Sequence, residues 1–360
     1  MDRIRNVKIY GTLGPACSDP GMLKRMFEEG MDGIRLNLSH TSLAESGDLI
    51  DALFSAASAC GVRPEFMIDM QGPELRIGRL DEPLQLNEGD VISPDSIPFP
   101  QAVRDCLNKD CGSDKAGRTA RDASAKDVPG GQDILLDDGK ILLRAGSGGR
   151  LRVMRGGRLQ GRKSIALPGC GIEAPAMTAA DRENILNAKK YGVTAVMQPF
   201  VRSKEDLIEV RGALDEAGCS DVRIFAKIEN MAGMEKLGEL IPYCDEIVIA
   251  RGDLGSAMEL WELPAAQKRI AAACRGAGRD FMVVTQMLDS MMHRQVPTRA
   301  EVSDIFNAVL DGAASVMVTG ETAAGEYPDL VIRCMAKTVR EACQYILNSM
   351  NDESMGDGSL

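Results

Sequence analysis

The stretch Phe225-Ala226-Lys227-Ile228-Glu229-Asn230 closes an apolar run that begins at Val222 and is typical of a buried strand. Side chains alternate across a strand, so Lys227 and Glu229 point to the same face. Two opposite charges on the inner face of a core strand are costly unless they are paired or used. A metal ion on the carboxylate and an anionic substrate facing the ammonium would explain both; a buried ion pair without chemistry is the alternative.

Length and charge limit the classes of protein that this chain can represent. Its 360 residues suffice for one large barrel or two ordinary domains, and a hydrophobic content of 44% is normal for a globular core. The net charge of −11 argues against nucleic-acid binding, because phosphate backbones need a basic surface. A small anionic substrate remains possible, since it responds to the local field of its site. No apolar run approaches the roughly 20 residues of a membrane span.

The cysteines and the first residues indicate the compartment. The ten cysteines are scattered and lack zinc-type pairs, which predicts reduced core thiols in the cytoplasm. Cys106 and Cys111 are the closest pair. Because the chain has only two histidines, His40 and His293, we expect no metal site at that pair. The N-terminus lacks the apolar core of a signal peptide.

Strand and helix patterns alternate along most of the chain. Eight segments are predicted as strands: 7–13, 33–39, 65–70, 194–200, 222–228, 246–251, 281–287 and 315–321. Helical patterns cover 20–29, 42–60, 178–191, 203–217, 231–241, 264–277, 299–310 and 329–347. Eight such units over about 270 residues predict a (β/α)₈ TIM barrel. A doubly wound open sheet is the alternative, but the glycine fingerprint of a dinucleotide site is missing after the first strand.

The region from 77 to 164 differs from the rest. It contains short strand-like pieces at 83–86, 134–136, 141–143 and 151–154, and many glycine turns. We interpret it as a small β-rich lid domain inserted into the third strand–helix loop. The barrel domain then comprises 1–76 and 165–348, and 349–360 form a disordered tail.

Local composition gives three further expectations for the inserted region. The polar segment Asp105 to Gly131 is expected to be mobile. Gly146-Ser147-Gly148-Gly149 and Gly156-Gly157 are interpreted as hairpin turns. A phosphate-binding loop at these glycines is the less favoured alternative.

Polar side chains gather at the predicted strand ends, where the active site of a TIM barrel lies. They are Arg35, Asn37, Ser39, Asp69, Lys227, Glu229, Asp253 and Thr285. Glu229 and Asp253 follow neighbouring strands, and two carboxylates suit Mg²⁺ or Mn²⁺ with waters left on the ion. Lys227 and Arg35 supply the positive charge that phosphoryl transfer requires.

In order along the chain, several segments resemble the pyruvate kinase family. They are Thr12–Ala16, Arg35–His40, Gln71–Arg76, Leu136–Gly139, Lys227–Asn230, Ala250–Gly255, Thr285–Met291, Pro297–Asp304 and Gly320–Thr322. Each segment alone is a modest signal, but together at barrel strand ends they are specific. The resemblance covers residues 7 to about 345 and is weak between 80 and 165. It implies phosphoryl transfer from phosphoenolpyruvate to ADP, giving pyruvate and ATP.

The resemblance implies roles for the substrate and metal residues. Glu229 and Asp253 would bind the divalent ion that bridges to phosphoenolpyruvate. Lys227 would steady the phosphoryl group in transit, and Arg35 would contact it. Gly252 and Asp253 would lie at the substrate, and Thr285 would lie near the enolate face that receives a proton. Backbone N–H groups of the segment that opens at Gly252 and Asp253 could hold a carboxylate or phosphate.

The resemblance also implies a K⁺ site and a nucleotide site. Asn37, Ser39, Asp69 and the backbone carbonyl of Met70 would hold K⁺. His40, Arg76, Asn37 and Lys163 would reach the nucleotide, with the inserted domain as its lid; a loop role without ligand is the alternative for His40. Family members with a glutamate at the position of Glu74 tend to need K⁺.

Several departures from the family pattern bear on regulation and assembly. The family carries a C-terminal regulatory domain, and this sequence stops at its first helix, so we expect a short form and a homodimer. Met70 and Gln71 replace the usual Thr-Lys, Pro199 replaces a serine, and Thr319 replaces another. The alternatives are a Mg-dependent lyase or aldolase using a pyruvate enolate, a specialised kinase acting on another enol phosphate, and a non-catalytic binding protein.

Overall fold

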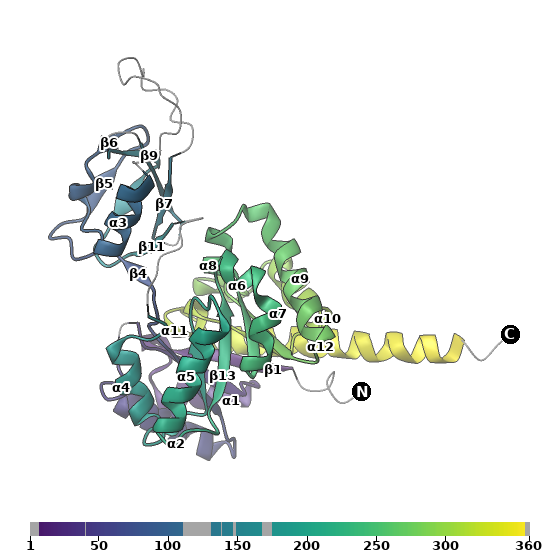
Figure 1. The fold of residues 1–360 in the computed structure, drawn as a ribbon. Coiled ribbons are helices and arrows are strands. Elements are labelled where there is room, and N and C mark those ends of the chain that lie inside the picture. The colour runs from purple at the N-terminus through teal and green to yellow at the C-terminus, as the bar shows by residue number, and fades with distance from the viewer. Residues whose placement is uncertain are drawn as a thin grey trace. The chain divides into compact units, whose positions relative to one another are not determined.

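Eight parallel strands close into a barrel in the computed structural model, which describes residues 7–39, 41–110, 131–137, 139–146, 149–167 and 175–356 (Figure 1). The strands are β1 (Lys8–Leu13), β2 (Gly33–Asn37), β3 (Glu65–Asp69), β12 (Ala195–Gln198), β13 (Arg223–Ile228), β14 (Glu246–Ala250), β15 (Asp280–Val284) and β16 (Ser315–Met317). β1 pairs with both β2 and β16, so the sheet has no free edge. The (β/α)₈ prediction is confirmed, and the open-sheet alternative is excluded.

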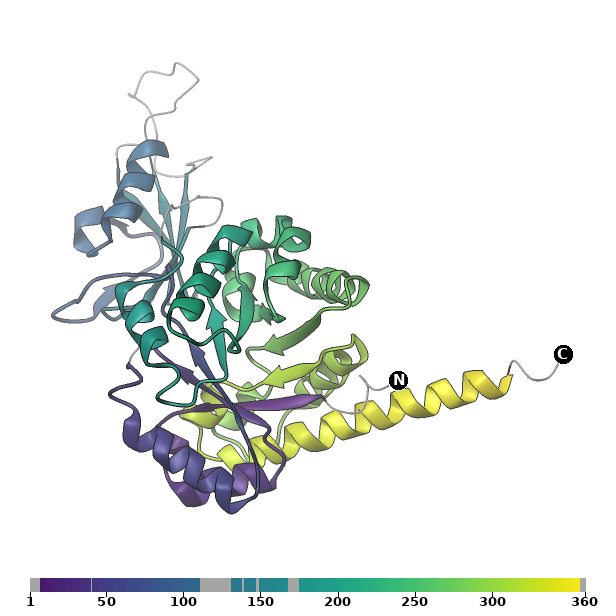
Figure 2. The same ribbon diagram turned by 60° about the horizontal axis from the view of Figure 1, so that its bottom comes forward.

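Helices follow the barrel strands and cover the outside of the barrel (Figures 1 and 2). They are α1 (Pro20–Glu28), α2 (Gly47–Ala59), α4 (Ala179–Asn187), α5 (Lys204–Glu216), α6 (Met231–Glu235), α7 (Leu237–Leu240), α8 (Arg251–Ser256), α9 (Leu263–Gly276), α10 (Arg299–Leu310), α11 (Gly320–Ala323) and α12 (Pro328–Gly356). Asp19 caps α1 by accepting a hydrogen bond from the backbone of Met22, with Pro20 at the first helical position.

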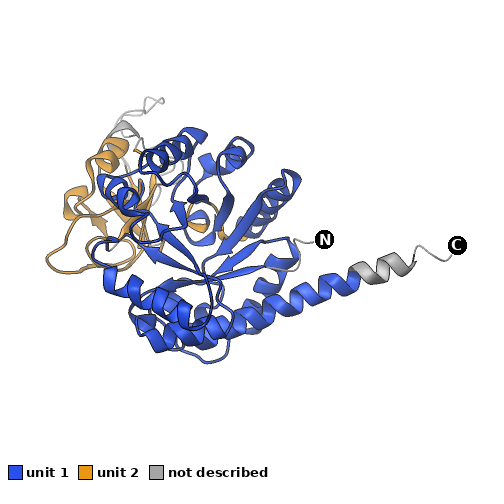
Figure 3. Cartoon of the chain, turned by 90° about the horizontal axis from the view of Figure 1, so that it is seen from below, with its two compact units in different colours: residues 1–72, 176–254, 262–360 blue, residues 73–175, 255–261 orange. Residues whose placement is uncertain are grey.

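The chain divides into two compact units, coloured separately in Figure 3. Unit 1 comprises 1–72, 176–254 and 262–360 and contains the barrel. Unit 2 comprises 73–175 and 255–261. Its elements are β4 (Leu75–Arg76), β5 (Leu84–Leu86), β6 (Val91–Ile92), α3 (Gln101–Asp110), β7 (Asp133–Leu136), β8 (Ile141–Ala145), β9 (Leu151–Arg155), β10 (Gly157–Leu159) and β11 (Ser164–Ala166). The sequence placed these boundaries at 77 and 164.

Unit 2 has antiparallel sheets and a hydrophobic core of its own. Six strands form one sheet in the order β4-β11-β7-β8-β9-β6, and β10 pairs with β5. The buried side chains of Ile97, Val103, Ile134 and Leu143 lie in its core. A β-rich insertion is therefore confirmed.

One expectation for unit 2 was wrong, and another can be compared with the structure over only part of its residues. Gly156-Gly157 is not a hairpin turn, because Gly157 begins β10 and pairs with Leu86 of β5. The polar segment from Asp105 is helical as far as Asp110, since α3 buries Val103 and Leu107; residues 111–130 lie outside the described part. The turn at Gly146 is confirmed, with its N–H donating to the carbonyl of Arg150 at 2.8 Å between β8 and β9.

Two further expectations differ from the structure. Helix α2 starts at Gly47 rather than at Ser42, because the Asn184 side chain takes the N–H of Leu43 at 2.9 Å. Helix α12 continues to Gly356, so the tail predicted from 349 is helical over most of its length. The sequence from Leu347 contains no proline, and Gly356 is its first glycine, so nothing earlier stops the helix.

The cysteines follow the prediction only in part. Cys17, Cys60, Cys219, Cys244, Cys274, Cys334 and Cys343 are free thiols. Cys106 is disulfide-bonded, contrary to the expectation that every cysteine is reduced. Within the described ranges, no helix combines the length and hydrophobicity that a bilayer crossing needs.

Candidate active site

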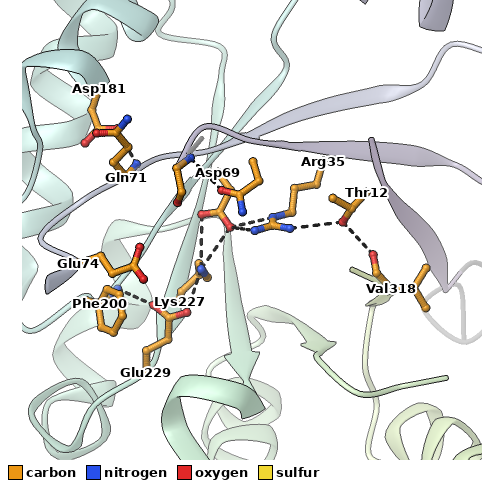
Figure 4. A network of polar contacts seen from close by, with 12 residues as sticks. Thr12, Arg35, Asp69, Gln71, Glu74, Asp181, Phe200, Lys227, Glu229 and Val318 are labelled. Carbon is orange, nitrogen blue, oxygen red and sulfur yellow. Dashed lines mark hydrogen bonds and ion pairs between the residues drawn. The ribbon is translucent and has the colours of Figure 1, made fainter. Parts of the chain in front are cut away.

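Lys227 and Glu229 lie side by side at the carboxyl end of β13, as their spacing predicts. The Lys227 Nζ is 2.9 Å from Oε1 of Glu229, and their side chains are 13% and 0% exposed. The same Nζ lies 3.2 Å from Oδ2 of Asp69, the last residue of β3. The ammonium is therefore shared between two carboxylates from different strands (Figure 4).

Arg35 brings a second buried cation to the same carboxylate. Its Nε and Nη2 lie 2.8 and 2.6 Å from Oδ2 of Asp69. Its Nη1 donates to Oγ1 of Thr12 at 3.4 Å, and that hydroxyl donates to the carbonyl of Val318 at 2.9 Å. Figure 4 shows these side chains converging from several strands. Alternation inside a closed barrel causes this convergence, because every second residue of each strand points inward.

Glu229 is held by a backbone donor as well as by Lys227. The N–H of Phe200, just after β12, donates to Oε2 of Glu229 at 2.8 Å. Phe200 has a φ of 51°, in the left-handed region. Oε1 of Glu229 is buried and accepts no hydrogen bond with good geometry, although it faces the Lys227 ammonium. One carboxylate oxygen therefore retains capacity for a ligand.

Burial and charge oppose one another in this cluster. Burial, with a further contribution from Asp253, raises the pKa of Glu229 to about 7, although Lys227 acts to lower it. Burial alone would lower the pKa of Lys227, but Asp69 and Glu229 outweigh it and raise the pKa. Burial would raise the pKa of Asp69, but Lys227 and Arg35 outweigh it and lower the pKa. Two cations, Lys227 and Arg35, therefore stabilise the charged form of Asp69, whereas Lys227 is the cation beside Glu229.

The donor set fits a divalent cation with hard oxygen ligands. Asp253 in α8 is close enough to Glu229 to raise its pKa, so the two carboxylates repel each other without added positive charge. Among the described residues, no group of three or more His, Cys, Asp or Glu side chains could hold a metal. Two carboxylates with the remaining positions left to water or substrate are typical of Mg²⁺ sites.

The residues expected at the K⁺ site lie close together around the ends of β2 and β3. Asn37 and Asp69 are directly paired in register, and Oδ1 of Asn37 accepts the N–H of Ser39 at 3.1 Å. Met70 is buried, and its N–H donates to the carbonyl of Met197 at 3.2 Å. Met70 replaces the threonine that is usual in the family, and this hydrogen bond holds its backbone in place.

Gly252 and Thr285 meet at the ends of β14 and β15. A Cβ added to Gly252 would lie 3.0 Å from Cγ2 of Thr285, so a side chain here would press on the Thr285 methyl group. Thr285 has a φ of 81°, and its carbonyl accepts two hydrogen bonds from Arg251. The structure therefore places both sequence-predicted residues beside one another.

The expected nucleotide residues outside the barrel belong to unit 2. Nζ of Lys163 is 2.8 Å from Oδ1 of Asp137. Arg76 pairs with Glu74 at 2.9 Å and donates to the carbonyl of Arg162 at 3.0 Å. His40 lies outside the described residues. The side chains of Lys163 and Arg76 remain partly exposed, at 32% each.

Sequence reasoning missed three residues that shape the site. Thr12 anchors Arg35, the backbone of Phe200 holds Glu229, and Arg251 holds Thr285. A backbone donor leaves no residue-type signal in a sequence. Arg251 did offer one, because a charged residue directly follows the apolar strand that ends at Ala250.

A family model and the similar curated proteins all point to the same family. A family model described as the pyruvate kinase barrel domain matches residues 4–332. The chain is 35% identical over 352 residues to the pyruvate kinase of Sporosarcina psychrophila, covering 95% of this chain and 58% of that protein. It is 36% identical to that of Mycobacterium intracellulare, covering 93% and 70%, and 35% identical to that of Aeropyrum pernix, covering 95% and 72%.

Proposed function

The chain belongs to the pyruvate kinase family, and from this premise we propose that it transfers the phosphoryl group of phosphoenolpyruvate to ADP, giving pyruvate and ATP. The observation that carries the proposal is the buried cluster in which Lys227 and Arg35 share the carboxylate of Asp69, with Glu229 on the other side of the ammonium. A cluster of this kind suits a reaction that depends on placed charge rather than on covalent help from the protein.

Lys227 and Arg35 have the main roles in this proposal. The transferring phosphoryl group carries charge on its equatorial oxygens, and both side chains are fixed cations that can stabilise it. Ion pairs with Asp69 hold them in place before substrate arrives, so little reorganisation is needed at the moment of reaction. Their low exposure excludes water, which strengthens each interaction.

Glu229 and Asp253 would hold Mg²⁺ or Mn²⁺, and Asn37, Ser39, Asp69 and the carbonyl of Met70 would hold K⁺. Lys227, Arg35, Asp69 and Glu229 together carry no net formal charge, so they cannot balance a substrate with a phosphate and a carboxylate. The cations supply that missing charge when bound. We expect turnover to need a divalent ion and to fall when K⁺ is replaced by tetramethylammonium.

Thr285, Gly252 and the start of α8 would face the organic part of the substrate. Gly252 lies in the first turn of α8, directly beside Thr285. In this proposal Thr285 lies at the enolate face that receives a proton. His40, Arg76, Asn37 and Lys163 would contact the nucleotide.

A coupled assay tests the proposed function. The chain is mixed with phosphoenolpyruvate, ADP, Mg²⁺ and K⁺, and lactate dehydrogenase reports pyruvate by the loss of NADH absorbance. We expect pyruvate to form only when ADP is present. Pyruvate formation that is independent of ADP, or no pyruvate at any K⁺ concentration, would contradict the proposal.

We also propose a cytoplasmic homodimer. The free thiols of Cys17, Cys219, Cys244 and Cys274 fit a reducing compartment, whereas the disulfide at Cys106 does not. Light scattering on the purified chain measures the assembly directly, and a mass of one chain or of four chains would contradict the dimer.

A further inference from the structure

Thr285 and Gln286 have backbone conformations that non-glycine residues rarely adopt. Their φ angles are 81° and 55°. A β-branched threonine in the left-handed region is strained, because its Cβ substituents crowd the backbone. Such strain persists only where surrounding contacts over-determine the conformation, and it often occurs at functional sites. The residue that supplies those contacts therefore controls where the Thr285 side chain lies.

Arg251 supplies these contacts. Its Nε and Nη2 donate to the carbonyl of Thr285 at 3.2 and 2.7 Å. Its Nη1 donates to Oδ2 of Asp304 in α10 at 2.6 Å, and Nη2 lies 2.9 Å from Sδ of Met287. The Arg251 side chain is 12% exposed. One planar guanidinium therefore joins the start of α8, the end of β15 and α10.

The residues next to Arg251 belong to the candidate site. The backbone of Gly252 packs against the methyl group of Thr285, and Asp253 acts electrostatically on Glu229 and Lys227. The main chain at 251–253 thus lines the site while the Arg251 side chain turns away and fixes its neighbour. The Arg251 guanidinium is held by Thr285, Asp304 and Met287, which is the arrangement of a residue that acts through another.

We propose that Arg251 is a positioning residue, which fixes Thr285 for the proton step that completes pyruvate formation. This inference rests on the proposed function. In that step the electron pair of the enolate double bond forms a C–H bond at C3, and the enolate oxygen becomes the ketone oxygen. The proton comes from a donor at the site that is reprotonated by solvent water. Arg251 does not touch the reacting atoms; it holds Thr285 beside them.

Proton exchange isolates this step from phosphoryl transfer. Pyruvate is incubated with the chain in D₂O with Mg²⁺, K⁺ and ATP, and proton NMR follows the loss of the methyl signal. Arg251→Lys keeps a cation for Asp304 but cannot donate the two-pronged contact to Thr285. We expect exchange to slow about tenfold or more, while the KM for phosphoenolpyruvate changes by less than about threefold.

Matched variants separate positioning from general damage to the fold. Arg275 donates to the carbonyl of Asp311, so Arg275→Lys makes the same change at another arginine–carbonyl contact and is expected to exchange at the wild-type rate. Asp304→Asn keeps the contact to Thr285 and is expected to slow exchange less than Arg251→Lys. In a Thr285→Ala background, Arg251→Lys should slow exchange little further, because the Thr285 side chain that Arg251 positions is absent.

Two outcomes would overturn the inference alone: wild-type exchange in Arg251→Lys, or an undiminished effect of Arg251→Lys in the Thr285→Ala background. Either result in a chain that makes ADP-dependent pyruvate leaves the proposed function intact. A wild-type chain that makes no pyruvate contradicts the proposed function, and the inference falls with it.

Discussion

Lys227 is a single ammonium between two buried carboxylates, Asp69 and Glu229. Replacing it with methionine keeps the volume but removes the charge that faces the transferring group. We expect Lys227→Met to lower turnover about a thousandfold, the scale seen when one preorganised transition-state donor is removed. Phosphoenolpyruvate should still bind, which calorimetry can measure.

Lys24→Met is the matched control for that variant. Lys24 is 50% exposed and pairs with Glu28 on the surface of α1, so this variant should turn over normally. Circular dichroism checks that Lys227→Met is folded, because removing a partner from a buried ion pair destabilises a protein. Intact turnover in folded Lys227→Met would remove Lys227 from the proposed mechanism.

Glu246 forms a second buried polar cluster, at the start of β14. It pairs with Arg223 at 3.0 Å and accepts a hydrogen bond from Ser315. Burial raises its pKa from 4.5 to about 7 despite both partners. Between these values the unfolded carboxyl is ionised and the folded one keeps its proton. Its contribution to stability is therefore complete below pH 4.5 and is lost as the pH rises through about 7.

Glu246→Gln should remove this pH dependence. The shift in the pKa of Glu246 corresponds to roughly 3 kcal/mol at most. When the pH rises from 4.5 to 7, the free energy of unfolding should therefore fall more in the wild type than in the variant, by up to that amount. Urea unfolding at both pH values measures the difference. Parallel pH profiles for the two proteins would show that another group is responsible.

For single residues, the sequence predicts which side chains share a face of a strand, because side chains alternate along it, but it predicts few of their contacts. The shared face of Lys227 and Glu229 follows from their spacing of two. The pairing of Arg35 with Asp69 depends on which strands become neighbours in the barrel, which no local pattern contains. The resemblance identified these residues as a set, but the N–H of Phe200 and the strained φ of Thr285 come from the tertiary structure.

Among the elements, α4 shows how a helix start can support the site. Thr178 caps α4 in a reciprocal capping box with Asp181. The Asp181 carboxylate also accepts the N–H groups of Gln71 and Gly72 at 2.7 and 2.9 Å. This fully buried side chain therefore ties the segment after β3, which carries Asp69, to the start of α4.

Asp181→Asn should destabilise the fold because its amide would face N–H donors. We expect the free energy of unfolding to fall by about 2–4 kcal/mol, as for other broken buried networks. Asp19→Asn at the exposed cap of α1 is the control and should change it by less than about 0.5 kcal/mol, because asparagine caps as well as aspartate. Urea unfolding compares the two, and equal effects would contradict the bridging role.

The sequence predicted element types better than element ends. The helix predicted from 178 starts there because its cap, Thr178, is a local interaction. The start of α2 was wrong because a distant side chain, Asn184, captures the backbone of Leu43. The pairing of β10 with β5 was missed because Gly156-Gly157 has the composition of a turn, while its strand partner lies far away in the sequence.

At the scale of the barrel, the interior is polar at both ends and apolar between them. Tyr10, Met67, Met197, Phe225 and Met282 are buried in the middle layer. Glu65, Arg223 and Glu246 lie at the strand starts, and the Lys227 cluster lies at the strand ends. The apolar middle layer separates a structural ion network from the candidate active site. Function at one end can therefore be tested without disturbing the other.

In the proposed reaction a phosphoryl group moves between two small molecules, and phosphorus NMR follows its phosphorus atom directly. Phosphoenolpyruvate and ADP are incubated with the chain, Mg²⁺ and K⁺, and the phosphoenolpyruvate signal is monitored. We expect the γ-phosphate signal of ATP to replace this signal. An unchanged phosphoenolpyruvate signal, or its conversion to inorganic phosphate alone, would contradict the proposed function.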